Sequence, residues 1–196
     1  MLKRLLDIAG SLCGLVVMAA LYPFIALAIK YGSKGPALIT LPRISQGRVI
    51  NVYKFRSMVD AAHTQKKALA HLNERNDGPF FKIKNDPRVT RTGRWIRKFR
   101  LDEIPQFINV LKGELSLVGP RPHEPEETVA YPAEYRHILI AKAGITGLSQ
   151  VNGASSLPFL KELEYEDYYI SHQSLWLDVK ILAKTAAIFF TDPTAV

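Results

Sequence analysis

The chain has 196 residues and a formal net charge of +8, and 47% of its residues are hydrophobic. This composition excludes an intrinsically disordered chain and predicts one domain with an appended segment. Cys13 is the only cysteine, which excludes an intramolecular disulfide and a cysteine-based zinc site and is typical of a reducing compartment. The positive charge indicates an anionic partner: nucleic acid, an acidic membrane surface or a phosphorylated substrate.

The first element is an apolar segment of 22 residues without a charge, from Ile8 to Ile29. It is long enough to cross a bilayer, so a membrane-spanning anchor is one interpretation. However, Pro23 lies inside the segment and is expected to kink or break a helix there. Basic residues flank both ends, which favours both ends in the cytoplasm. A re-entrant helix broken at Pro23 satisfies both observations, and we predict such a membrane region over residues 1–36, followed by a second domain over residues 37–196.

The second domain mixes β-prone segments, turns and helical patterns. The sequence predicts a strand over residues 49–55, an exposed helix over 60–73 and a short strand over 80–84. Further along, it predicts a helix over 131–142, a glycine-punctuated loop over 144–153 and a closing helix over 171–190. The predicted fold is therefore α/β, mainly helical with a small β-sheet.

A basic run precedes a pair of acids in the middle of the chain. Six of the thirteen residues from Arg88 to Arg100 are basic, and a helix is predicted within them. Trp95 and Phe99 lie four residues apart and share one face of that helix, which is typical of an amphipathic helix at a membrane interface. The alternative is a core-facing helix with an exposed basic side.

Asp102 and Glu103 follow at the start of a second predicted helix, which Gly113 is placed to end. A helix N-terminus attracts anions, and guanidinium groups match phosphate oxygens. A carboxylate can bind magnesium or attack phosphorus. This stretch therefore suits phosphate chemistry, but the alternative is that the two acids only cap the helix and the arginines form a solvated face.

Ten segments, in order along nearly the whole chain, resemble the bacterial sugar transferases, the monotopic phosphoglycosyl transferases that start glycan assembly on a polyprenol phosphate. One of them reads LDEIPQ and contains Asp102 and Glu103, and another ends in SLVGPRP and contains Arg121. The matching segments are residues 3–7, 23, 33–36, 53–58, 77–79, 82–88, 101–106, 109–122, 144–147 and 177–181.

The resemblance implies an activity and roles for individual residues. It implies transfer of a sugar-1-phosphate from a UDP-sugar to polyprenyl (undecaprenyl) phosphate, with magnesium as cofactor and UMP as product. Asp102 would be the nucleophile that forms a covalent phospho-sugar intermediate, and Glu103 would complete the dyad and hold the metal with Asp102. The expected substrate and phosphate ligands are Arg97, Arg121, Arg56, Lys84 and Gln150.

The resemblance also implies a location and partners. We expect the bacterial inner membrane, monotopic insertion, a catalytic domain that faces the cytoplasm, a homodimer and no nucleic-acid partner. The expected role is the first membrane step of exopolysaccharide, O-antigen or glycoprotein glycan synthesis. We expect the minimal catalytic-core form of the family, without the additional N-terminal membrane domain of larger members.

Some residues depart from the family pattern. Tyr22 stands before the proline where serine is usual, Leu41 begins the segment where Gln-x-Arg is common, and Arg100 replaces a small polar residue. Ser149 and Ala154 replace an aromatic residue and an arginine in the glycine loop. These departures leave an alternative open: a catalytically degenerate membrane-bound module that binds anionic lipid or partner proteins. A membrane-anchored nucleic-acid binder has the required charge, but the sequence lacks a recognisable binding motif.

Overall fold

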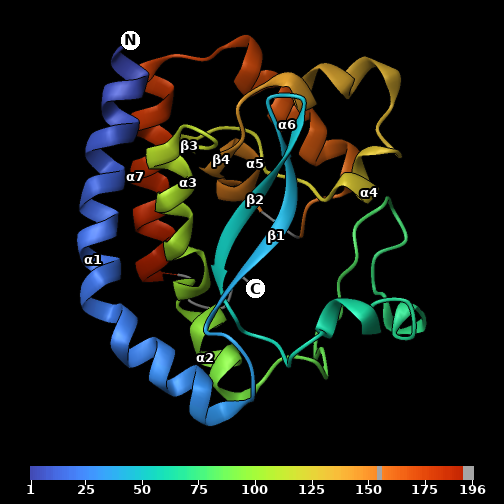
Figure 1. Ribbon diagram of the computed structural model, residues 1–196. Coiled ribbons are helices and arrows are strands. Elements are labelled where there is room, and N and C mark those ends of the chain that lie inside the picture. The colour runs from blue at the N-terminus through green and yellow to red at the C-terminus, as the bar shows by residue number, and fades with distance from the viewer. Residues whose placement is uncertain (154–155, 192–196) are drawn as a thin grey trace.

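The computed structural model describes residues 1–153 and 156–191, and Ala154 therefore lies outside the described residues. Helices predominate, and two small two-stranded sheets accompany them (Figure 1). The α-helices are α1 (Leu2–Gly32), α2 (Arg91–Lys98), α3 (Phe107–Lys112), α4 (Pro125–Thr128), α5 (Leu148–Val151), α6 (Phe159–Ser171) and α7 (Leu175–Thr191). The 3-10 helices are η1 (Ala62–Gln65), η2 (Ala70–Leu72), η3 (Leu101–Gln106) and η4 (Ala133–Ile140). This architecture confirms the predicted mainly helical α/β class.

The two sheets differ in direction and in position. β1 (Leu38–Ser45) and β2 (Arg48–Phe55) form an antiparallel hairpin that crosses the middle of the molecule (Figure 1). Gln46 and Gly47 form its turn, both with positive φ. β3 (Ser116–Val118) pairs in parallel with β4 (Gly144–Thr146). The predicted strand over 49–55 is confirmed as part of β2.

The N-terminal apolar segment is one continuous helix of 31 residues, α1, with Pro23 inside it. Its dark blue N-terminal part runs beside α3 and α7, and its lighter C-terminal part bends towards α2 (Figure 1). A proline removes one backbone hydrogen bond and leaves the other turns intact. The prediction of a helix broken at Pro23 is therefore corrected: the helix is continuous through Pro23, and the chain changes direction there through a bend.

Both ends of α1 are fastened to the rest of the protein. Near its start, the buried Asp7 carboxylate accepts hydrogen bonds from Ser116 Oγ at 2.9 Å and from the Leu117 amide at 2.8 Å. After its end, the buried Arg56 guanidinium donates to three backbone carbonyls within residues 33–35. In between, α3 approaches so closely that a Cβ at Gly14 would lie 2.4 Å from the Phe107 ring. The helix thus lies along the protein over much of its length.

The opposite face of α1 is apolar and exposed. The helix is long and apolar enough to cross a membrane, yet only 17% of its most apolar stretch of 18 residues is buried inside the protein. Its length and its exposed apolar face make α1 a candidate membrane segment. Its exposed large side chains are Leu2, Leu5, Leu12, Val16, Val17, Tyr22, Phe24, Leu27 and Tyr31.

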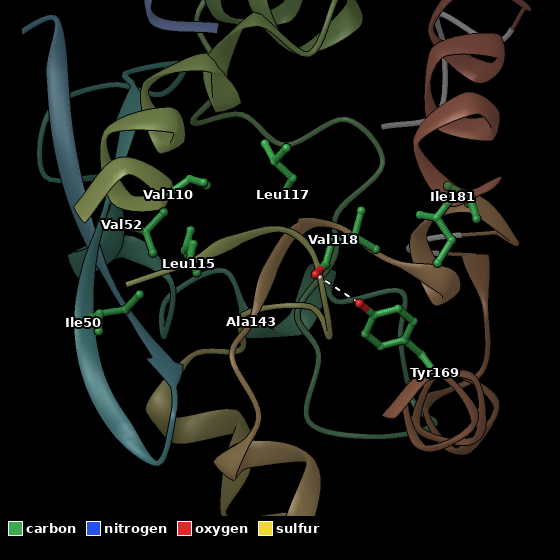
Figure 2. Close-up of a cluster of buried hydrophobic side chains, with 10 residues drawn as sticks. Ile50, Val52, Val110, Leu115, Leu117, Val118, Ala143, Tyr169 and Ile181 are labelled. Atoms are coloured by element: carbon green, nitrogen blue, oxygen red, sulfur yellow. Dashed lines mark hydrogen bonds between the residues drawn. The ribbon is translucent and has the colours of Figure 1, made fainter. Parts of the chain in front are cut away.

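The main hydrophobic core lies between the β1–β2 hairpin and the C-terminal helices α6 and α7 (Figure 2). Val110, Leu115 and Val118 are almost fully buried in it. Tyr169 of α6 reaches into this core and donates a hydrogen bond from its hydroxyl to the Val118 carbonyl at 3.2 Å (Figure 2). This contact holds α6 against β3, directly before the residues that enter the functional site.

Several predicted elements take a different form. The prediction of a regular helix over 60–73 is wrong, because the segment contains only the short 3-10 helices η1 and η2. Ala62 is the only hydrophobic residue of these two helices that is buried. Without an apolar stripe to pack, a short helix has little to stabilise it. The strand predicted over 80–84 has no partner strand, because the Lys82 amide donates to the Asn73 side chain instead.

The C-terminal part also differs from the prediction in detail. The helix predicted over 131–142 is the 3-10 helix η4. The predicted glycine loop over 144–153 contains β4 and α5, and α6 was not predicted as a helix. The predicted closing helix is confirmed as α7, in which Ile181 is buried and Trp176 is 67% exposed.

Candidate active site

A cleft of about 1100 Å³ opens between the β1–β2 hairpin, α2, η3 and the segment between β2 and α2. All seven residues that the sequence predicted as catalytic or substrate-binding line this one cleft: Arg56, Lys84, Arg97, Asp102, Glu103, Arg121 and Gln150. They come from parts of the chain that are up to 94 residues apart, and the fold brings them together.

Helix α2 carries Arg97 into the cleft. The Thr90 hydroxyl caps the helix by accepting a hydrogen bond from the Gly93 amide at 2.8 Å. A Cβ at Gly93 would lie 1.7 Å from the Ser57 carbonyl oxygen, so only glycine allows this close approach. The approach brings Arg97 Nε to 2.9 Å from Ser57 Oγ. Burial lowers the pKa of Arg97, although Asp102 and Asp86 oppose that change.

A left-handed turn at Arg100 separates α2 from η3. Its φ of 50° is unusual for a residue with a side chain, and the Arg100 amide donates to the Arg97 carbonyl at 2.8 Å. This turn directs the acids of η3 back towards the arginine of α2. The predicted helix after the acids is confirmed from Phe107 and ends at Gly113, which has a φ of 82°, but its first turns are 3-10.

Lys54 of β2 lies against both acids of η3. Its ammonium is 2.8 Å from Glu103 Oε1 and 3.8 Å from Asp102 Oδ2. The Asp102 side chain is 15% exposed and the Glu103 side chain 36% exposed, so both can be reached from the cleft. Asn109 fixes this geometry, because its side chain accepts from the Tyr53 amide at 3.0 Å and donates to the Asn51 carbonyl at 2.8 Å.

The pKa values of the two neighbouring carboxyls are shifted in opposite directions. Burial raises the pKa of Asp102, and the negative charge of Glu103 adds to this rise while Lys54 and Arg97 oppose it. Burial also acts to raise the pKa of Glu103, but Lys54, and after it Arg121 and Arg100, outweigh burial and lower it. Two acids whose pKa values are pushed apart are typical of a site in which they have different chemical roles.

Arg121 enters the cleft directly after β3. Its backbone amide donates to Glu166 Oε2 at 2.8 Å, and its side chain is 39% exposed. Guanidinium Nε lies 3.9 Å from Glu162 Oε1, and no protein group in the described part of the chain forms a hydrogen bond with the guanidinium. The terminal nitrogens are therefore open to a phosphate.

The three other predicted ligands differ in their freedom to bind substrate. Arg56 is buried, and both of its terminal nitrogens already donate to backbone carbonyls after α1. Lys84 is exposed and lines the cleft, and its amide donates to Glu74 Oε1 at 3.0 Å. Gln150 Nε2 donates to the Ile145 carbonyl at 3.0 Å, and its Oε1 is buried without a partner in the described residues. Of the three, Arg56 has the clearest structural role.

Sequence reasoning missed Lys54 as a member of the site. It also missed the far end of the cleft, where Glu124 lies 2.5 Å from Lys66 and 3.3 Å from Arg43. The signal for Lys54 was its place near the end of a strand, inside one of the segments that resemble the family. Nothing local indicated the pairing of Glu124, because its partners lie 58 and 81 residues earlier.

The donor set at Asp102 and Glu103 fits a magnesium ion that is shared with a substrate. Magnesium prefers carboxylate oxygens and is commonly held by one or two carboxylates together with substrate phosphates. Within residues 1–153 and 156–191, no group of three or more His, Cys, Asp or Glu side chains forms a metal site by itself. The two acids therefore suit a cation that arrives with a phosphorylated ligand.

The fold thus combines a long apolar N-terminal helix with a cleft in which a carboxylate pair lies beside a lysine and arginines. A family model described as "Bacterial sugar transferase" matches residues 1–192. The chain belongs to the bacterial sugar transferase family.

The relatives match nearly the whole chain. It is 40% identical to the galactosyl transferase CpsE of Streptococcus agalactiae, over 95% of this chain and 41% of the relative. It is 39% identical to the undecaprenyl-phosphate galactose phosphotransferase of Salmonella typhimurium, over 95% and 40%. It is 36% identical to the UDP-glucose:undecaprenyl-phosphate glucose-1-phosphate transferase of Escherichia coli, over 100% and 41%. The chain thus spans about two fifths of the length of these relatives.

Proposed function

We propose that this protein transfers a sugar-1-phosphate from a UDP-sugar to a polyprenyl phosphate and releases UMP. One observation supports this function above all: the Asp102–Glu103–Lys54 cluster lies in a cleft with Arg97 and Arg121 open to phosphate, beside a long apolar helix. The names of the relatives support the same reaction, because they include sugar-1-phosphate transferases that act on undecaprenyl phosphate. These names supply the substrate classes, and the site supplies the chemistry.

In the first half-reaction, an Asp102 carboxylate oxygen attacks the phosphorus that carries the sugar. A bond forms between this oxygen and phosphorus, and the phosphoanhydride bond breaks, so that UMP leaves with the bridging oxygen. Arg97 and Arg121 neutralise the phosphate oxygens in the transition state. Asp102 must be ionised for this attack, and the neighbouring Lys54 favours its ionised form.

In the second half-reaction, an oxygen of the lipid phosphate attacks the same phosphorus. The bond to Asp102 breaks, the carboxylate is restored, and the product is a sugar linked to the polyprenol through a diphosphate. A covalent intermediate lets a soluble donor and a lipid acceptor use one site in turn. The exposed apolar face of α1 lies in the same molecule, so the lipid phosphate need not leave the membrane surface.

Magnesium belongs to this proposal, with Asp102 and Glu103 as its protein ligands. When bound, the ion supplies positive charge that compensates the phosphates of donor and acceptor. The Lys54 ammonium lies close to the same two carboxylates, so we expect it to compete with the magnesium ion for Glu103.

We further propose a location at the bacterial inner membrane with the cleft facing the cytoplasm, where nucleotide sugars are made. Both ends of α1 contact the part of the protein that carries the cleft, which supports insertion from one side. A place at the first membrane step of exopolysaccharide, O-antigen or glycoprotein glycan synthesis follows from the reaction, because its product is a lipid-linked sugar.

The test is UMP release from a panel of UDP-sugars by the purified protein in nanodiscs with undecaprenyl phosphate and Mg²⁺. We expect release with at least one donor, loss of release in EDTA, and a phosphorylated adduct that Asp102→Asn lacks. Asp167→Asn is the matched control, because Asp167 pairs with His137 at 2.7 Å, away from the cleft. Near-normal turnover of Asp102→Asn would contradict the nucleophile assignment. No release with any donor would favour a degenerate module.

A further inference from the structure

A second cluster of charged side chains lies behind Arg121, on the side away from the cleft. Glu162 and Glu166 stand one turn apart on α6, and each is only 1% exposed. Glu166 accepts hydrogen bonds from the Arg121 amide and the Ser149 hydroxyl, so its role in holding the backbone is clear. The two Glu162 oxygens have no hydrogen-bond partner among the described residues.

A buried carboxylate without hydrogen bonds requires a physical reason, because charge is costly to remove from water. Two groups that can carry positive charge lie near Glu162, namely Arg121 Nε at 3.9 Å and His123 Nε2 at 3.7 Å from the same oxygen. His123 is itself buried, stacks on Phe80 with ring centroids 5.1 Å apart, and has Glu127 3.5 Å from Nδ1. Of these neighbours, only Arg121 reaches the cleft and carries a permanent charge.

We propose that Glu162 is a positioning residue for Arg121: its carboxylate holds the Nε side of the guanidinium, so that the terminal nitrogens stay free for a substrate phosphate. The inference rests on the proposed function, because it assigns Arg121 to the phosphate in the transition state. No group in the described residues forms a hydrogen bond with the Arg121 guanidinium, and the Glu162 carboxylate, 3.9 Å from Nε, is its ion-pair partner there.

The charges around Arg121 agree with this role. Burial acts to lower the pKa of Arg121, but Glu162 first, and Glu103 after it, outweigh burial and raise it. Glu162 therefore stabilises the charge of the guanidinium from the Nε side, away from the cleft, and Glu103 attracts it from within the cleft. Without Glu162, Glu103 would be left as the larger attraction, and the guanidinium would be free to turn towards the catalytic acids.

A double-mutant cycle tests the proposal through UMP release in nanodiscs. We expect Glu162→Gln to lower kcat by about tenfold or more with a smaller change in KM, because a transition-state contact is lost. We expect a similar loss for Arg121→Lys, which keeps the charge and loses the planar fork. If Glu162 acts through Arg121, the double variant is about as slow as Arg121→Lys alone, since the two losses are then not additive.

Glu164→Gln is the matched control. Glu164 lies on the same helix, is about half exposed and pairs only with Lys161 at 2.6 Å, so its kcat should stay close to that of the wild type. The melting temperature of each variant separates a positioning role from a structural one. A folded Glu162→Gln protein with wild-type kcat, or losses that multiply in the double variant, would overturn the proposal.

If Glu162→Gln does not fold, Glu162→Asp enters the same cycle, because it keeps the charge and withdraws it by one carbon. The same outcomes then decide, and failure of both variants to fold would show that Glu162 is structural and would overturn the proposal. The wild-type arm keeps the two hypotheses apart. Absence of UMP release by the wild type contradicts the proposed function, whereas wild-type release with an unaffected Glu162 variant contradicts only the inference.

Discussion

The Lys3 ammonium lies 2.6 Å from Asp178 Oδ2, and this ion pair joins the start of α1 to the start of α7 across 175 residues of sequence. Lys3 also donates to the Val118 carbonyl at 2.9 Å and to the Tyr169 hydroxyl at 3.1 Å. Asp178 is 1% exposed, so the pair is partly desolvated and carries more weight than a surface ion pair. The N-terminus of the apolar helix is thereby fixed to the body that carries the cleft.

Lys3→Met should destabilise the protein by about 3 kcal/mol, because it leaves the buried Asp178 carboxylate without a cation. Chemical unfolding in detergent, followed by tryptophan fluorescence, measures the change. Lys30→Met is the control, since Lys30 is exposed in the last turn of the same helix. Adding Asp178→Asn to Lys3→Met should recover part of the loss. Equal stability of Lys3→Met and Lys30→Met would show that the ion pair contributes little.

Lys54→Met should move the acid limb of the pH–rate profile to higher pH. Lys54 opposes the rise in the pKa of Asp102 and is the main group that lowers the pKa of Glu103. Without Lys54, both carboxyls hold their protons to a higher pH, and Asp102, the proposed nucleophile, is ionised over a narrower pH range. The profile of kcat between pH 5 and 9 measures the shift.

The matched control is Lys112→Met. Lys112 is exposed, lies outside the cleft and donates to the Tyr53 hydroxyl at 3.1 Å. Tyr53 directly precedes Lys54 in β2. Its profile should coincide with that of the wild type. A Lys54→Met profile that also coincides with the wild type would mean that Lys54 does not set the ionisation of the two acids.

Raising the pH should destabilise the fold through Glu166. Burial raises the pKa of Glu166 from the usual 4.5 to about 8, and the neighbouring Glu162 adds to this rise while the Ser149 hydroxyl opposes it. The folded state therefore holds a proton that the unfolded chain releases, so this contribution to stability is complete below pH 4.5 and is lost as the pH rises through about 8. We expect the melting temperature to fall between pH 6 and pH 9.

Glu166→Gln tests the source of this pH dependence. Glutamine is always neutral, so the variant should lose most of the fall in melting temperature between pH 6 and pH 9. Glu164→Gln, on the exposed side of the same helix, should keep the dependence of the wild type. Equal slopes for the wild type and Glu166→Gln would assign the pH dependence to another group.

The sequence identified the site residues better than the shapes of the elements that carry them. Asp102, Glu103 and Arg121 belong to segments with a recognisable order of residue types, Arg97 belongs to the basic run before them, and all four line the cleft. The short distance from Lys54 to the two acids could not be predicted from local sequence. It depends on Asn109 of α3, whose side chain forms hydrogen bonds with the backbone of β2.

The errors in the fold have the same origin. Residues 60–73 show a helical spacing of alanine and leucine, but Ala62 is the only hydrophobic residue of η1 and η2 that is buried, and the segment forms short 3-10 turns. The helix α6 was not predicted because its acids and tyrosines lack a continuous apolar stripe. Two of these acids, Glu162 and Glu166, are buried. Their partners are Arg121 and His123 for Glu162 and Ser149 for Glu166, and hydrophobic periodicity does not indicate such polar partners.

The last prediction concerns the topology of α1. A straight helix of 31 residues would be about 46 Å long, enough to span a ~30 Å hydrocarbon core. Yet Lys3 is bound to α7 at one end, and the carbonyls of residues 33–35 are bound to Arg56 at the other. Because both ends are held by the same folded body, we expect both to lie on one side of the membrane, the cytoplasmic side.

Single cysteines at two exposed positions, Leu2→Cys and Lys34→Cys, test this in a Cys13→Ser background. The Lys34 side chain takes no part in fastening the helix, because Arg56 contacts Lys34 through its backbone carbonyl, which a cysteine keeps. In intact cells, a membrane-impermeant maleimide should label neither cysteine, and in inverted vesicles it should label both. Adding Lys3→Met should release the N-terminus and make some Leu2→Cys molecules reactive from the periplasm. Periplasmic labelling of Leu2→Cys in the otherwise unchanged protein would show that α1 spans the bilayer, against the contacts at its two ends.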